Sequence, residues 1–327
     1  MESAEFPQPS IGCSYSCSLP TSTQGCLLRL PSCENCQRKL SLDQPDFSAA
    51  WQDQLEIVDR TKQQTHALRH LLAGGKAFLM CGGPSANQQP LEQLAYKGVF
   101  TFAVNNVAAH PRVRPQAFVC SDPPKKFSYS IWADPGILKF IPTPKFKPNR
   151  SKLRKKELGA FINLPQRTSD CPNVWGFKRH SWLWPDERFF LSDGACWGNH
   201  EAGVRLTDQP KTVSTMFLGL RILYYLGARE IYLLGVDFHM TPQAGYSFGQ
   251  GRDQGASDSN NHAYGVINNW FCQLQQNGTF AKFGLTIYNT YEYSGLRAFA
   301  YLPFEQAIRR ATKDIEQFPD LSDWYNS

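Results

Sequence analysis

The sequence predicts an α/β fold: a Rossmann-like, mostly parallel sheet with helices on both faces, a Cys-rich N-terminal appendage and a Pro/Trp-rich insertion. Two observations predict the sheet. Short apolar runs alternate with stretches of helical periodicity, which is typical of strands joined by crossover helices. Several of these runs end in glycine or a polar residue, as strands do beside the ligand crevice of open α/β sheets. With 327 residues, 42% of them hydrophobic, the chain can bury a large core.

The elements of the first half are read from apolar spacing. A helix is expected over 46–72, because apolar residues recur at helical spacing and the pattern stops at Gly74. Apolar runs then predict three buried strands, and the turn after the first of them leads into a helix near 90–96. These strands are expected at 77–81, 99–104 and 116–121.

The second half continues the pattern. A helix rich in Leu, Phe and Tyr is expected over 214–226, where Gly227 closes it. Strands follow at 230–235 and 285–289, and a terminal helix at 304–312. These alternating elements extend the predicted parallel sheet.

Two segments lie outside this pattern. Residues 1–45 are rich in Ser, Pro, Cys and Gln, so we expect a tail or a small zinc-binding appendage before the main domain at 46–327. Residues 125–210 hold many prolines and tryptophans with little periodicity, and we expect an insertion or lid over the sheet. Within it, Trp175, Trp182 and Trp184 occur with Lys178, Arg179 and His180. This mixture fits an aromatic cluster under a loop, or stacking on a base or sugar.

The cysteines fall into two groups. Cys33 and Cys36 form a CxxC motif, and Cys13 and Cys17 precede it. Thiolates at such spacing suit tetrahedral zinc, and a structural Zn²⁺ would stabilise a segment that has no core. A Cys-bearing tail without metal is the alternative. The five cysteines of the body are expected to be reduced and buried.

Composition limits the compartment and the partners. No stretch reaches the roughly 18 apolar residues of a membrane span, and the N-terminus lacks a secretory pattern, so a cytoplasmic protein is expected. The net charge of +6 is mild, and basic residues gather in 145–156. This run fits a solvated loop, a lid over phosphates, or a patch that docks an acidic polymer.

The strand ends carry the candidate binding residues. The first strand ends in a glycine turn, the second in two asparagines, and two others in an aspartate. These residues are Gly82, Gly83, Pro84 and Ser85, then Asn105 and Asn106, Asp122, and Asp237. Glycine lets a backbone approach a phosphate, and a helix N-terminus offers N–H groups to an anion. A nucleotide pocket is expected where these ends converge, although the turn alone also fits ordinary turn chemistry and matches neither a Walker P-loop nor GxGxxG.

A resemblance follows from these motifs. The chain resembles bacterial CMP-sialic-acid sialyltransferases in three motifs. These are the glycine turn, Val104-Asn105-Asn106, and Ser214-Thr215 at the start of a helix that runs into LRILYYLGAREIYLLGVDF. They also resemble the archaeal-type 6-hydroxymethylpterin diphosphokinase-like family. The resemblance covers roughly 76–122 and 212–310.

The resemblance implies roles for single residues. Asn105 would hold the nucleotide, Ser214 and Thr215 would cap the helix that faces it, and His262, within Asn260–Tyr264, would be the general base. An imidazole of ordinary pKa, near ~6.5, suits that task. The sequence departs from the sialyltransferase pattern at Gly82, where the family has Asn, and at Ala263, which separates the family's His-Tyr pair.

Three functions stay open from the sequence. The first is a transferase that uses a nucleotide or nucleotide sugar as donor, a sialyltransferase-like glycosyltransferase, with a glycan or an acidic polymer as acceptor. The second is an ATP-dependent diphosphokinase, in which Asp122 and Asp237 would hold Mg²⁺ on the phosphates. The third is a non-catalytic nucleotide-binding protein. His262 also fits a surface residue of an Asn-rich loop, and His239 is the competing base.

Overall fold

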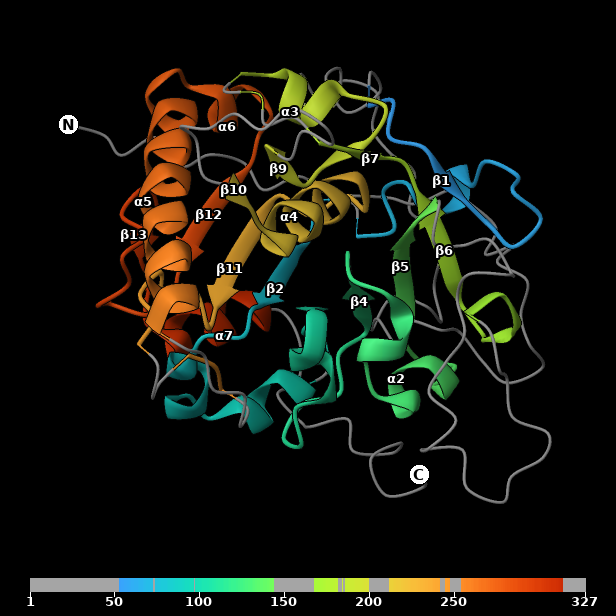
Figure 1. The fold of residues 1–327 in the computed structure, drawn as a ribbon, viewed down its shortest axis with the longest axis horizontal. Coiled ribbons are helices and arrows are strands. Elements are labelled where there is room, and N and C mark those ends of the chain that lie inside the picture. Colours follow the sequence, from blue (N-terminus) through green and yellow to red (C-terminus); the bar gives the residue numbers. More distant parts are fainter. Residues whose placement is uncertain are drawn as a thin grey trace.

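A nine-stranded sheet organises the protein, with the strand order β1-β6-β5-β4-β3-β2-β11-β12-β13 (Figure 1). The computed structural model describes residues 53–72, 74–96, 98–143, 168–181, 184, 186–199, 212–241, 245–247 and 254–313. The strands are β1 (Ile57–Val58), β2 (Lys76–Met80), β3 (Thr101–Val104), β4 (Ala117–Val119), β5 (Leu138–Pro142), β6 (Val174–Phe177), β11 (Glu230–Leu234), β12 (Thr286–Asn289) and β13 (Ala300–Tyr301). All neighbours pair in parallel except β1 and β6, so the predicted fold class is confirmed.

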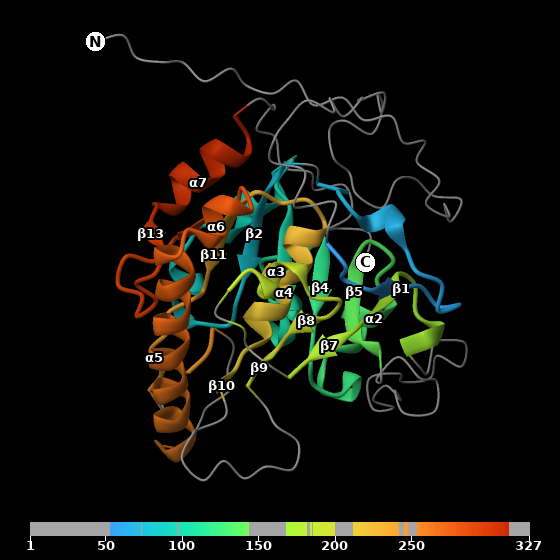
Figure 2. The ribbon, with the colours of Figure 1, turned by 90° about the horizontal axis from the view of Figure 1, so that it is seen from above.

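Helices cover both faces of the sheet, and the alternation of side chains along β2 shows how. Phe78 points to one face, where its ring lies 5.8 Å from Phe304 of α7 (Phe304–Ala311). Leu79 points to the other face, where α4 (Thr215–Tyr225) crosses it closely: a Cβ on Gly219 would lie 2.6 Å from Leu79 Cδ1. Figure 2 shows α7 and α4 on opposite sides of the strands.

The remaining helices and two small sheets surround this core. The α-helices are α2 (Tyr129–Ala133), α3 (Arg188–Leu191), α5 (Gln254–Gln276) and α6 (Thr279–Lys282). The short sheets pair β7 (Arg179–His180) with β8 (Ala195–Cys196), and β9 (Gly198–Asn199) with β10 (Thr212–Val213). The 3₁₀ helices include η4 (Pro84–Gln88), η5 (Leu91–Ala95) and η6 (Asn105–Ala109).

The strand order reverses direction between β2 and β11. From β2 the chain builds β3, β4, β5 and β6 on one side, and then returns through α4 to place β11 on the other side. A crevice opens at such a switch point, outside the carboxyl ends of the strands. The glycine turn after β2 and the loop that carries Asp237 after β11 meet at this switch point.

Three expectations differ from the structure. Within 53–72 there is no α-helix: Leu55 and Ile57 are buried, whereas Gln54 and Glu56 between them are exposed, and this period of two makes an extended segment that pairs as β1. The helices after the glycine turn are 3₁₀ rather than α. Two strands of the expected lid, β5 and β6, belong to the central sheet.

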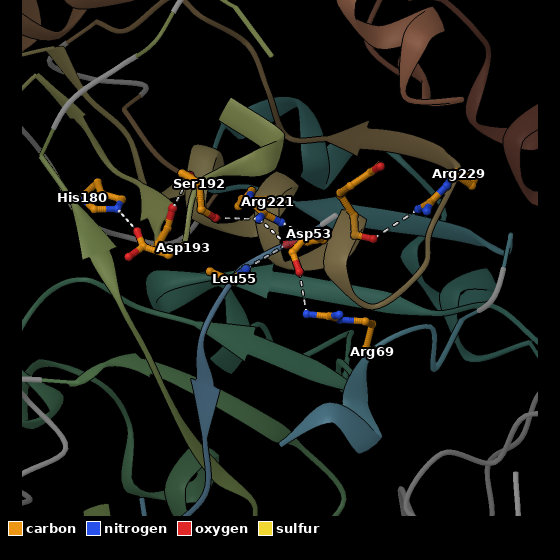
Figure 3. A network of polar contacts seen from close by, with 10 residues as sticks. Asp53, Leu55, Arg69, His180, Ser192, Asp193, Arg221 and Arg229 are labelled. Carbon is orange, nitrogen blue, oxygen red and sulfur yellow. Dashed lines mark hydrogen bonds and ion pairs between the residues drawn. The ribbon is translucent and has the colours of Figure 1, made fainter. Parts of the chain in front are cut away.

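Two buried cations tie the chain together. Arg221 of α4 donates from Nη1 to Asp53 Oδ2 at 2.8 Å and from Nη2 to Asp53 Oδ1 at 2.5 Å, with exposed fractions of 0% and 3% (Figure 3). Nη2 of Arg221 also donates to the Ser192 carbonyl at 3.0 Å. At the amino end of β5, Lys139 is fully buried and donates to three backbone carbonyls, those of Asp134, Ile137 and Pro172.

Candidate functional site

The glycine turn is bonded to the loop that follows β11. Gly83 N donates to the Gly235 carbonyl at 2.8 Å, and Ser85 N donates to Asp237 Oδ2 at 2.9 Å. The Ser85 hydroxyl donates to the other oxygen of the same carboxylate. The structure thus brings Ser85 and Asp237 together, as partners of one another.

The need for glycine in the turn has a steric cause. A Cβ on Gly83 would lie 2.5 Å from Asp237 Oδ1 and 2.6 Å from the Gly235 carbonyl oxygen. Pro84 then opens η4, whose five residues form a short 3₁₀ helix. The amides of Gly83 and Ser85 are engaged within the protein, so the approach of a phosphate is not what requires this glycine. Gly82 is bonded too, since its carbonyl accepts from Ser247 N at 2.8 Å.

Asp237 is a half-buried carboxyl group beside this turn. Burial raises its pKa above the ordinary value, while the two Ser85 hydrogen bonds and the charge of His239 act in the opposite direction. The other predicted aspartate, Asp122, is exposed and pairs with Lys126 at 3.2 Å.

The two aspartates are not brought together. The strands β3 and β2 lie between β4, which precedes Asp122, and β11, which precedes Asp237. Three strand spacings amount to about 14 Å, too far for one Mg²⁺ to contact both carboxylates. Among the described residues there is no group of three His, Cys, Asp or Glu side chains that could hold a metal ion.

Asn105 and Thr215 meet at the carboxyl edge of the sheet, although 110 positions separate them. Asn105 Nδ2 donates to Thr215 Oγ1 at 3.1 Å. Thr215 is the first residue of α4, and Ser214 caps that helix by accepting from Met216 N at 3.2 Å. The structure thus brings together three of the four residues that the resemblance had named, all but His262, while Asn106 follows in η6 with a half-buried side chain.

The backbone and amide of Asn105 are unusual. Its φ of +54° lies in the left-handed region, which Asn tolerates better than most residues but still at a cost. Its Oδ1 is shielded from solvent and has no hydrogen-bond partner among the described residues. A buried acceptor left unpaired is unfavourable, so a hydrogen-bond donor of a ligand that reached this oxygen would relieve that cost.

His262 lies on α5, not in a loop. The face of α5 that contacts the loop after β11 carries Asn261, which forms two 2.8 Å hydrogen bonds to the backbone of Met240, and Tyr264, whose ring stacks on Phe238 at 4.8 Å. His262 is exposed and shares the solvent-facing stripe with Val266, one turn further on.

His239 lies in the loop itself, between Phe238 and Met240. It is exposed, and its charge acts on Asp237. Phe238 has a φ of +53°, a rare conformation for an aromatic residue, and its stacking on Tyr264 helps to hold it. Of the two histidines, His239 is therefore the one that lies beside Asp237, at the switch point of the sheet.

Some of the expected site residues lie outside the described part of the chain. These are Cys13, Cys17, Cys33 and Cys36, and the basic run 145–156. Trp175 is a buried residue of β6, so one member of the Trp-rich cluster is a core residue. No helix among the described residues is both long enough and apolar enough to cross a bilayer.

Comparisons with known proteins give a distant structural likeness. No family model and no curated protein matches the chain. Among solved structures, the sialyltransferase CstII from Campylobacter jejuni, determined with a substrate analogue, cytidine-5'-monophosphate, matches with a TM-score of 0.35 and 13% identity. The match covers 70% of this chain and 85% of that one. A TM-score this low does not carry an activity from one protein to the other.

Proposed function

We propose that this protein is a transferase that binds a nucleotide-linked donor, most specifically a nucleotide sugar, at the carboxyl ends of β2, β3 and β11. The observation that carries the proposal is the pairing of Asn105 with Thr215 at this edge. The pairing fixes the Asn105 amide, whose unpaired, buried Oδ1 can accept a hydrogen bond from a nucleoside. The sialyltransferase-like pattern of these same residues supports this choice of ligand.

The chemistry we propose is an inverting displacement. A base removes the proton from an acceptor hydroxyl as its oxygen attacks the anomeric carbon. The bond from that carbon to the phosphate oxygen breaks, and its electron pair leaves with the nucleotide. No metal is needed to balance this step, and the distance between Asp122 and Asp237 argues against the diphosphokinase alternative in which both hold one Mg²⁺.

Two histidines compete for the role of base, and the geometry favours His239. It lies two residues after Asp237, whereas His262 points to solvent from the far side of α5. We expect His239→Ala to lower turnover by roughly 10²–10⁴-fold with little change in donor affinity, and His262→Ala to stay near the wild type. The opposite result would return the role to His262, as the sequence resemblance implies.

The binding test uses a pair of matched asparagines. Asn105 and Asn173 both have left-handed backbones, with φ of +54° and +53°, but Asn173 immediately precedes β6, at the amino edge of the sheet. Glycine tolerates this backbone conformation, so each Asn→Gly variant removes the amide with little backbone strain. Calorimetry with nucleoside monophosphates and nucleotide sugars should show about a tenfold or larger loss of affinity for Asn105→Gly, the equivalent of one or two hydrogen bonds.

The control should bind as the wild type does. If Asn105→Gly and Asn173→Gly bind a nucleotide equally well, Asn105 is not part of the pocket. If the wild type binds nucleotides but neither transfers nor hydrolyses any donor, the non-catalytic alternative is the correct one.

A further inference from the structure

Arg179 is a half-buried cation whose guanidinium has two defined contacts. It opens β7, Nη1 donates to Ser121 Oγ at 2.7 Å, and the guanidinium carbon lies 4.3 Å from the centroid of the Trp197 ring. Ser121, which is buried, follows β4. The stack and the hydrogen bond fix the plane of the guanidinium, and the group keeps further N–H donors.

The charge of Arg179 has no counter-ion in the part of the chain that the structure describes. The residues on either side of it in the sequence do have an acidic partner: Lys178 and His180 both contact the carboxylate of Asp193. Burial lowers the pKa of the Arg179 guanidinium. A partly desolvated, uncompensated cation is costly, and an anion would relieve that cost.

Arg179 lies at the same edge as Asn105, through a chain of direct contacts. Trp197, on which it stacks, accepts at its carbonyl from Ser214 N at 2.9 Å. Ser214 caps α4, whose first residue, Thr215, accepts from Asn105. Ser121 and Asn105 follow the adjacent strands β4 and β3, about 5 Å apart in the sheet. Because Arg179 is bonded to Ser121, one ligand of nucleotide size can contact both Arg179 and Asn105.

We propose that Arg179, oriented by Ser121 and Trp197, binds the phosphate group of the donor nucleotide. This inference rests on the proposed function for the identity of the ligand, but the anion site itself depends only on the geometry of Arg179. A guanidinium held in a plane presents paired N–H donors, which match two oxygens of a phosphate better than a lysine ammonium does. Arg179 would thus bind the phosphate in place of the glycine turn, whose Gly83 and Ser85 amides are already bonded within the protein.

The test compares ligands with and without the phosphate. The probes are the four ribonucleoside 5'-monophosphates, their nucleosides and inorganic phosphate, each titrated calorimetrically into the full-length protein. Arg179→Gln should lower affinity for the preferred monophosphate by tenfold or more, leave the affinity for its nucleoside unchanged, and abolish binding of inorganic phosphate. Arg179→Lys, which keeps the charge but loses the planar fork, should be intermediate.

The matched control is Arg309→Gln, which removes one positive charge from an exposed position of α7. This end of α7 lies at the opposite edge of the sheet, where Lys76 at the start of β2 donates to the Arg310 carbonyl. We expect it to bind every probe as the wild type does. Should Arg179→Gln not fold, Ser121→Ala gives the second test, with an expected three- to tenfold loss for the monophosphate alone.

The outcomes separate this inference from the proposed function. Equal affinity of Arg179→Gln and wild type for a monophosphate overturns the role of Arg179 and leaves nucleotide binding intact. Arg179-dependent binding of inorganic phosphate without any preference for a nucleotide supports the anion site and overturns the nucleotide donor. A wild-type protein that binds none of the probes overturns both.

Discussion

The buried ion pair between Asp53 and Arg221 should be the most sensitive polar contact in the fold. Both side chains are almost wholly shielded from solvent, and the pair is bidentate. Asp53→Asn keeps the shape but removes the negative charge, which leaves the guanidinium of Arg221 buried without compensation. Breaking such a pair typically costs about 3–5 kcal/mol.

The assay is urea unfolding, followed by circular dichroism, with melting temperature as a second readout. For a domain of this size, a loss of 3–5 kcal/mol corresponds to a melting temperature roughly 6–20 °C lower. The matched control is Glu92→Gln. It breaks the Glu92–Arg112 pair, which is also bidentate but largely exposed, and should cost less than about 1 kcal/mol.

A double-mutant cycle separates the charge from the packing. Replacing both partners, as Asp53→Leu with Arg221→Met, removes both buried charges and should recover at least about 2 kcal/mol of the loss seen in the single variants. If Asp53→Asn costs no more than Glu92→Gln, burial of the pair does not make its loss more destabilising. A double variant that is no more stable than either single variant would contradict the same reasoning.

The remaining predictions concern three other positions. Burial, together with the positive charges of two neighbouring arginines, lowers the pKa of His70 to about 4, so between pH 6.5 and 4 the unfolded chain binds the proton that the folded protein does not. The free energy of unfolding should therefore fall by about 2–3 kcal/mol over that range, and His70→Asn, which suits the left-handed backbone there, should abolish most of this dependence in urea titrations. Lys139→Met deprives three carbonyls of their donor and should cost about 3 kcal/mol or more in the same assay, whereas Lys125→Met at an exposed position should cost less than about 0.5. Gly83→Ala should lower the melting temperature through its clash with the loop after β11, but Gly265→Ala, in open space on α5, should raise it; similar effects at both glycines would refute the steric argument.

The centre of the sheet could be predicted from the sequence because its strands are buried on both faces. The strands β2, β3 and β11 are nearly continuous apolar runs. The strand β12 differs, since its buried residues, Ile287 and Asn289, alternate with more exposed ones. The helix α4 was also predictable, since an apolar stretch begins at Ser214, a good N-cap, and ends before Gly227.

The helix α5 could not be predicted in the same way. Its first half is rich in Asn, Ser and Gly, residues of low helix propensity that are typical of loops. Tertiary contacts stabilise it instead: Trp270 and Phe271 pack against Phe217 of α4, with ring centroids 5.2 Å and 5.6 Å apart. The expectation that His262 lies in a loop was wrong for this reason.

The candidate site also contains both residues that the sequence indicated and contacts that it could not indicate. Local patterns indicated Asn105 and Ser214, because a polar residue at a strand end and a cap at a helix start are visible in a few positions of sequence. The contact of Ser85 with Asp237 joins residues 152 positions apart, and the contact of Arg179 with Ser121 joins residues 58 apart. Spacing along the chain carries no signal for such pairs, so the sequence pointed to the glycine turn as the phosphate site and not to Arg179.

The bonds between the glycine turn and the loop after β11 bear on the entropy of ligand binding. The hydrogen bonds from Gly83 to Gly235, from Ser85 to Asp237 and from Ser247 to Gly82 already hold the glycine turn and the loop after β11 in place. Immobilising one flexible side chain on association costs about 0.5–1.5 kcal/mol, and ordering a loop adds to this. A turn and a loop that are already held in place avoid that cost, so a ligand that binds beside them would lose mainly its own freedom of motion.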